Sequence, residues 1–222
     1  MTVDYPLTVI YPQPLSGAAW AGRRVGLLGG SFNPAHDGHR EISLYALRAL
    51  RLDQVWWLVS PQNPLKSTAD MATLEERLAV ARTTMRHPGV LVTDLESRLG
   101  TRYTAHTLAE LHHRYSRTRF VWLMGADNLA QVSRWRSWRR IFEEMPVAAF
   151  SRPAYSLKAL AGRAARRYFK NRIDVRSAGR LAGMRPPAWS FLRNPLHPES
   201  ATAIRRRRQS QTATDEAPPS PP

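Results

Sequence analysis

The sequence contains no cysteine and no long apolar segment. Without a thiol, the 222-residue chain has no disulfide framework, no thiolate metal site and no cysteine nucleophile. No run approaches about eighteen consecutive apolar residues, and the proline-containing start with Asp4 lacks the basic region of a secretory signal. We therefore expect neither a membrane-spanning helix nor a secretory signal. Since the lack of cysteine suits a reducing compartment, we expect a cytoplasmic protein.

Lysine is also scarce. Three of the 33 basic residues are lysine, so thirty are arginine, and the formal net charge is +16 with a pI of about 11.3. Arginine favours contacts with phosphates, whether these belong to a nucleic acid, a lipid or a nucleotide. The same composition also fits a solvated basic surface, so charge alone does not select a partner.

Short apolar runs alternate with amphipathic segments along the chain. The alternation predicts strands at residues 23–30, 54–60, 89–95, 119–125, 146–153 and 188–192. It predicts helices at residues 37–52, 73–86, 103–115, 137–145 and 156–169, with Gly162 weakening the last. Asp37 is available as a cap of the first helix, and Thr73 with Glu76 forms a capping box.

Strands that alternate with helices indicate an α/β fold with a doubly wound, mostly parallel sheet. We expect one domain over residues 23–208, after an N-terminal arm of residues 1–22. The polar, proline-rich residues 209–222 are predicted to be a disordered tail. In such sheets, ligands bind beyond the carboxyl ends of the strands.

The stretch GGSFNPAHDGH follows the first predicted strand and leads into the first predicted helix. Glycines allow a ligand to approach the backbone, and the start of a helix favours an anion. His36 and His39 add donors there, so the loop suits a polyphosphate. An ordinary turn with incidental histidines, or a metal site completed by Asp37, remains an alternative.

The unbroken match from Gly29 to His39 resembles the first signature of the nucleotidyltransferases. SATAIRRR near the C-terminus resembles their second signature, and MGADNLAQVSRWRSW, RYTAHTL and SPQNPLKS resemble segments of the bacterial nicotinate-nucleotide adenylyltransferases. Together these segments span most of the chain, in the order of that family.

This resemblance implies a Rossmann-like fold and the transfer of AMP from ATP to nicotinate mononucleotide, giving nicotinate adenine dinucleotide and pyrophosphate in NAD biosynthesis. It implies Mg²⁺ held mainly by the phosphates, without metal ligands from protein side chains. The phosphate oxygen of the acceptor attacks the α-phosphorus of ATP in line, so no covalent intermediate is expected, and catalysis consists of positioning and charge neutralisation.

The resemblance also assigns site residues. His36 and His39 are expected to be catalytic, and the ATP site consists of these two histidines with Gly30, Ser31, Phe32, Ser200, Thr202 and Arg205. The acceptor site is expected to contain Lys66, Thr104, Asp127, Trp135 and Arg152. Simple structural roles compete with several assignments, namely helix capping for Ser200, Thr202, Thr104 and Asp127, core packing for Trp135 and solvation for Lys66 and Arg152.

Two departures from the family pattern lie within the matched segments. Ala201 replaces a hydroxyl residue of the second signature, and Lys66 lacks the histidine that precedes it in many members. Nicotinamide mononucleotide and pantetheine phosphate remain alternative acceptors, and a basic nucleic-acid-binding protein is the rival of another class. We expect no specific nucleic acid and no membrane as partner, and a homo-oligomer is left open.

Overall fold

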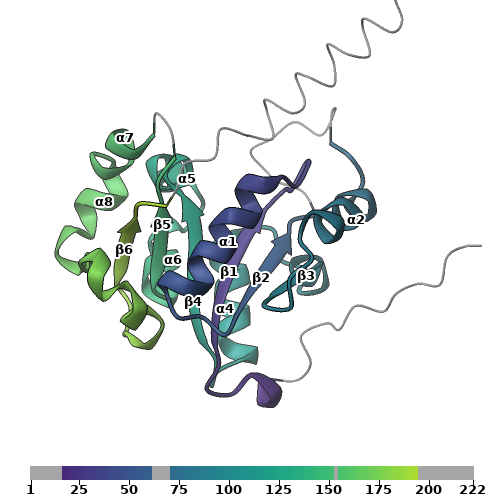
Figure 1. The fold of residues 1–222 in the computed structure, drawn as a ribbon. Coiled ribbons are helices and arrows are strands. Elements are labelled where there is room, and N and C mark those ends of the chain that lie inside the picture. The colour runs from purple at the N-terminus through teal and green to yellow at the C-terminus, as the bar shows by residue number, and fades with distance from the viewer. Residues whose placement is uncertain (1–16, 62–70, 153–154, 195–222) are drawn as a thin grey trace, which may run out of the picture.

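The computed structural model describes residues 17–61, 71–152 and 155–194 of the chain, which form a single α/β domain around a six-stranded sheet (Figure 1). The strands are β1 (Arg24–Gly30), β2 (Gln54–Val59), β3 (Val90–Thr93), β4 (Arg119–Gly125), β5 (Val147–Phe150) and β6 (Trp189–Leu192). All neighbouring strands pair in parallel, in the order β3-β2-β1-β4-β5-β6. The order reverses between β1 and β4, which is where a doubly wound sheet opens a crevice for ligands.

Helices cover both faces of this sheet. The α-helices are α1 (Asp37–Ala49), α2 (Leu74–Thr84), α3 (Leu95–Arg98), α4 (Thr104–Arg114), α5 (Ala126–Gln131), α6 (Trp138–Glu144), α7 (Ser156–Leu160) and α8 (Arg163–Arg167). The 3-10 helices are η1 (Gly17–Trp20), η2 (Val132–Arg134), η3 (Phe169–Asn171) and η4 (Val175–Gly183). One hydrophobic core joins the sheet to α1, α2 and η4, and the other joins it to α3–α8.

Burial on both faces explains why the strands are continuous apolar runs rather than alternating ones. Trp56 and Trp57 on β2 are both fully buried, yet they belong to opposite cores. Successive side chains of a strand point to opposite faces, so each tryptophan fills one layer.

The fold confirms the predicted α/β class, and the sheet is entirely rather than mostly parallel. The capping box of Thr73 and Glu76 is present at the start of α2. Two details differ. His36 rather than Asp37 caps α1, and the helix predicted at 156–169 is divided at Gly162, which is the N-cap of α8. The extended backbone of Gly162 interrupts the helical run, because glycine strongly disfavours a helix interior.

Residues 17–22 lie in the segment that the sequence predicts to be an arm, and they contact the domain. The Trp20 ring meets the Trp56 ring edge-on at a centroid distance of 4.9 Å, and the Thr118 hydroxyl donates to the Trp20 carbonyl. The proposed boundaries of arm, domain and tail stay predictions, since residues 1–16 and 195–222 are outside the described part. The described helices include none that is long and apolar enough to span a membrane.

A buried polar link between α1 and β2 provides a test of the fold. The Ser43 hydroxyl donates to the His39 carbonyl and accepts a 2.7 Å hydrogen bond from the Trp57 indole nitrogen. Replacing Ser43 by alanine leaves this buried indole N–H without its acceptor. We expect Ser43→Ala to lower the free energy of unfolding by about 1–3 kcal/mol in urea denaturation. Thr83→Ala on the exposed side of α2 serves as the control, and an equal loss in both variants would contradict the prediction.

Candidate active site

The glycines at the end of β1 allow close packing rather than an unusual backbone. A Cβ atom at Gly29 would overlap the ring of Trp122 on β4. Neither Gly29 nor Gly30 has a positive φ, whereas Phe32 does, with φ of 46°. Tight contact between β1 and β4 therefore explains the absence of a side chain at Gly29. The left-handed conformation occurs instead at Phe32, where the chain turns toward α1.

His36 and His39 form the cap of α1. The His36 Nδ1 accepts a hydrogen bond from the Gly38 N–H at 3.1 Å, and the His39 Nδ1 accepts from the His36 N–H at 3.3 Å. The ring centroids are 3.9 Å apart. Because each Nδ1 acts as an acceptor, the neutral rings carry their proton on Nε2. Each imidazole can thus present an Nε2–H donor beside the start of the helix.

Aromatic packing fixes the orientation of these histidines. The buried Phe32 ring stacks on Trp57 at a centroid distance of 4.8 Å and contacts His39 at the same distance. His36 is itself 5% exposed. The Phe32 side chain is therefore part of the core, and any contact of this residue with a ligand is made by its backbone.

A cavity of about 480 Å³ is lined in part by the same loop. The rest of its lining comes from β2 and β4, from α3–α5, from the two residues before α4 and from the segment after α5. The residues are Gly29, Gly30, Ser31, Leu58, Ser60, Glu96, Arg102, Tyr103, Thr104, Thr107, Trp122, Asp127, Asn128, Gln131, Arg134, Trp135 and Arg136. The structure thus brings Gly30 and Ser31, which were predicted for the ATP site, into one cavity with Thr104, Asp127 and Trp135, which were predicted for the acceptor site. His36 and His39 do not line the cavity.

Asp127, which lines the cavity, forms an ion pair with Arg152, whose buried Nε lies 3.6 Å from Asp127 Oδ1. Arg152 does not line the cavity, so its contact there is with Asp127. Asp127 occupies the second position of α5 and makes no capping bond, which removes the competing role as an N-cap. Thr104 is likewise the first helical residue of α4, whose N-cap is Tyr103.

Several cavity residues were not predicted from the sequence. Arg102, Arg134 and Arg136 bring three cations to the lining, and the Arg136 guanidinium lies over the Tyr103 ring at 5.0 Å. The sequence points to these three arginines only through their position, because they lie beside the predicted Thr104 and Trp135. Glu96 had no comparable signal, because α3 was not predicted.

Glu96 is a partly buried carboxyl that lines the cavity. Burial raises the pKa of its carboxyl above the usual value of 4.5, and hydrogen bonds from the Thr107 and Ser60 side chains oppose this shift. The Thr107 hydroxyl is also 2.8 Å from that of Thr101. Glu96 therefore connects the end of β2 with α4 at the base of the cavity.

Lys66, Ser200, Thr202 and Arg205 fall outside the described residues, so the structure does not place them. Within the described ranges, no group of three or more histidine, aspartate or glutamate side chains is arranged to hold a metal ion. The donors that can be described are backbone amides, imidazoles and guanidinium groups, which suit anions.

Comparison with known proteins identifies similar sequences and folds. The family model described as cytidylyltransferase-like matches residues 27–207. A protein of Parvibaculum lavamentivorans is 52% identical over 186 residues, covering 84% of this chain and 92% of its own, and one of Cereibacter sphaeroides is 57% identical over 181 residues, covering 82% and 96%. Both are named "Probable nicotinate-nucleotide adenylyltransferase". The Plasmodium falciparum nicotinic acid mononucleotide adenylyltransferase, solved in complex with NaAD, has a similar fold, with a TM-score of 0.62, 14% identity and 83% coverage of each chain.

The raised pKa of Glu96 gives a testable dependence of stability on pH. A carboxyl whose pKa is raised by folding stabilises the fold below its ordinary pKa of 4.5, and this contribution is lost as the pH rises through the folded-state pKa. We therefore expect Glu96→Gln to be more stable than the wild type at neutral pH, with the difference shrinking below pH 4.5. Denaturant melts from pH 4 to pH 8 measure it.

The exposed Glu75 on α2 provides the control for removing one negative charge. The free energy of unfolding of Glu75→Gln should depend on pH in the same way as that of the wild type. A Glu96→Gln protein that is less stable than the wild type at neutral pH would show that the ionised carboxylate stabilises the cavity.

Proposed function

The chain belongs to the cytidylyltransferase-like family and, within it, to the nicotinate-nucleotide adenylyltransferases, and from this premise we propose how its residues perform the reaction. The enzyme transfers AMP from ATP to nicotinate mononucleotide, giving nicotinate adenine dinucleotide and pyrophosphate in NAD biosynthesis. The observation that supports our assignment is the position of the Gly29–Phe32 loop, which leads into the histidine-capped start of α1 and whose first three residues line the cavity.

ATP binds on the histidine side of this loop. The first turn of α1 follows the loop, and its dipole favours the negative charge of a phosphate. The Nε2–H groups of His36 and His39 donate to the phosphates, and Gly30, Ser31 and Phe32 contribute backbone and hydroxyl contacts. The ring packing described above holds both imidazoles in place before the substrate arrives, so that little reorganisation is required.

Nicotinate mononucleotide binds in the cavity. Trp135 offers a flat face for the pyridine ring, Thr104 donates to the nicotinate carboxylate, and Asp127 accepts from the ribose hydroxyls. Arg152 orients Asp127 through their ion pair. By this pairing Arg152 fixes the direction of the Asp127 carboxylate, which accepts from the ribose. Arg152 is therefore a positioning residue for the acceptor nucleotide.

This arrangement places the two substrates on either side of the end of β1. The acceptor phosphate is already an anion, so no protein nucleophile is needed, and the chain has only to hold two polyanions in line and neutralise their charge. As the pyrophosphate group leaves, the two imidazoles stabilise the charge that develops on its oxygens. The product phosphodiester forms directly, without a covalent enzyme intermediate.

Enzymes of this type generally depend on a divalent cation, and we propose Mg²⁺. The described donor set suits the phosphates rather than the ion, because Asp127 is paired with Arg152 and Glu96 is bonded by Thr107 and Ser60. The ion is therefore held mainly by the phosphates of ATP, where it neutralises their charge.

The remaining assignments continue those of the sequence. Ser200, Thr202 and Arg205 are proposed to bind the phosphates of ATP, and Lys66 is proposed to bind the acceptor nucleotide. These four residues lie outside the described part, so their support is the match to the family signatures. We further propose that the enzyme works in the cytoplasm.

A pyrophosphate-release assay with ATP and Mg²⁺ tests the function. We expect turnover with nicotinate mononucleotide and a lower kcat/KM with nicotinamide mononucleotide. Equal rates with both acceptors would exclude the proposed specificity. We expect His39→Ala to reduce kcat by about 10²–10³-fold, because one donor to the developing charge is lost.

His39 also accepts the hydrogen bond of the helix cap, so stability must be separated from chemistry. Glutamine at the third helical position can accept from the N–H of the N-cap residue, as in a capping box. His39→Gln should therefore retain more of the wild-type stability than His39→Ala while remaining slow. A glutamine variant with wild-type kcat would remove the catalytic role of the imidazole.

Stacking on Trp135 is tested by the acceptor KM. Trp135→Leu removes the flat ring, and we expect the KM for nicotinate mononucleotide to rise about tenfold, since aromatic contacts contribute about 0.5–1.5 kcal/mol beyond burial. The KM for nicotinate mononucleotide should rise less in Trp135→Phe. The KM for ATP should stay near the wild-type value in both variants. A matching rise in both KM values would indicate a general disturbance of the site.

A further inference from the structure

Arg77 is a buried arginine that the assignments above leave without a role. It lies in the first half of α2 and is 1% exposed. Burial lowers the pKa of its guanidinium group, although an arginine remains charged at neutral pH. A buried charge is costly unless its donors are satisfied, so the partners of Arg77 indicate what the fold gains from it.

The guanidinium group donates to four backbone carbonyls. Nη1 donates to the carbonyls of Ser31 and Ser60, each at 2.7 Å. Nη2 donates to the Pro61 carbonyl at 3.0 Å, and Nε donates to the Ala72 carbonyl at 2.9 Å. The planar group therefore joins three segments, namely the loop after β1, the loop after β2 and the residue that precedes the cap of α2.

These segments carry the two halves of the proposed site. Ser31 belongs to the loop that leads from β1 to the histidines, and both Ser31 and Ser60 line the cavity. A backbone hydrogen bond from the Ser60 N–H to the Gly30 carbonyl also joins them, at 2.9 Å. On the opposite side, Glu96 accepts from the Ser60 side chain and from Thr107 of α4. Ser60 is thus held between Arg77 and Glu96.

The charge of Arg77 is not balanced by a carboxylate among the described residues, whose ion pairs do not include it. Only carbonyl oxygens accept its hydrogen bonds there. The positive charge therefore contributes to the potential at the Ser31 loop, where the phosphates of ATP are expected. A neutral side chain would provide neither this charge nor four donors in one plane.

We propose that Arg77 is a positioning residue, which fixes the loop after β1 relative to the loop after β2 so that the two substrates meet in line. This inference rests on the proposed function. Arg77 itself does not touch substrate. Its hydrogen bonds set the distance between the phosphate side and the acceptor side, and a small displacement of reacting groups lowers the rate strongly.

Arg77→Lys and Arg77→Gln test the proposal. Lysine keeps the charge but cannot reach four carbonyls in one plane, and glutamine keeps one amide donor group without the charge. We expect kcat/KM to fall about 10²-fold in Arg77→Lys and further in Arg77→Gln, measured well below the melting temperature of each variant. We also expect faster hydrogen exchange in peptides covering residues 29–32 and 58–61, with no substrate present.

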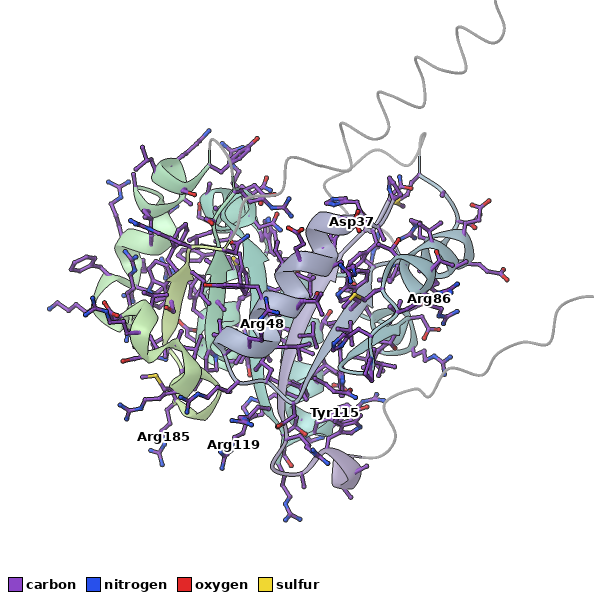
Figure 2. All side chains as sticks on the ribbon, viewed as in Figure 1. Asp37, Arg48, Arg86, Tyr115, Arg119 and Arg185 are labelled. Atoms are coloured by element: carbon purple, nitrogen blue, oxygen red, sulfur yellow. The ribbon has the colours of Figure 1, made fainter. Side chains whose placement is uncertain are left out.

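Two controls separate positioning from stability. Leu78→Ala removes a buried core side chain from the neighbouring position of α2, so it should lower the melting temperature without the loss of kcat/KM or the faster exchange in the two loops. Arg86→Lys makes the same chemical change at an exposed arginine just beyond α2 (Figure 2) and should match the wild type.

Wild-type kinetics in Arg77→Lys, or an equal loss of activity in Leu78→Ala, would overturn the proposal. So would the failure of both Arg77 variants to fold, which would assign Arg77 a purely structural role. Absence of pyrophosphate release by the wild-type enzyme would instead contradict the proposed function, and the exchange measurements would still report on the two loops.

Discussion

The first turn of α1 depends on hydrogen bonds accepted by two imidazole rings, and the rest of the site follows from this constraint. His36 and His39 use Nδ1 to satisfy backbone N–H groups, which the first turn of a helix cannot satisfy internally. The same bonds place the ring proton on Nε2. The rings are also held by Phe32, which stacks on Trp57, and Trp57 donates to Ser43 of the same helix. Figure 2 labels Asp37, the first residue of α1, at the end of this helix that follows the loop after β1. Fold and proposed chemistry therefore use different nitrogens of the same two rings, so a change that keeps an Nε2–H donor but removes the Nδ1 acceptor still alters the site.

The sequence predicted the elements whose signals are local and missed those that depend on distant partners. All six strands were predicted because burial on both faces makes each an apolar run, and the capping box at Thr73 is a local motif. Helix α3 has four residues, which are too few to show a helical period. Its residue Glu96 can be assigned a role only from its hydrogen bonds with Ser60 and Thr107. Arg77 looks like any charged helix residue until the ends of β1 and β2 are placed beside it. The family resemblance predicted single residues of the cavity, such as Trp135, but hydrogen bonds between segments are not visible in the sequence.

The large positive charge of the chain is distributed unevenly. Residues 155–194 contain ten exposed basic residues and a single acidic one, Asp174, and none of these lines the cavity. Figure 2 labels Arg185 near Arg119, which begins β4, so this arginine lies toward the amino ends of the strands and away from the proposed site. The net charge of +16 is therefore not a property that the reaction requires. The cavity has its own cations. The ten basic residues of 155–194, which add to the charge that suggested nucleic-acid binding, lie outside the cavity.

Within the cavity, the balance of charges bears on the choice between an acidic and an amide acceptor. Three arginines, Arg102, Arg134 and Arg136, share the lining with only two carboxyls. Asp127 is already paired with Arg152, and the raised pKa of Glu96 opposes its negative charge. An acid and an amide of the same shape differ by one charge. The three arginines are exposed, so solvent screens them, and one charge at about 4 Å from such a cation is stabilised by about 1 kcal/mol. We infer that the flanking arginines favour the nicotinate over the nicotinamide nucleotide through this field.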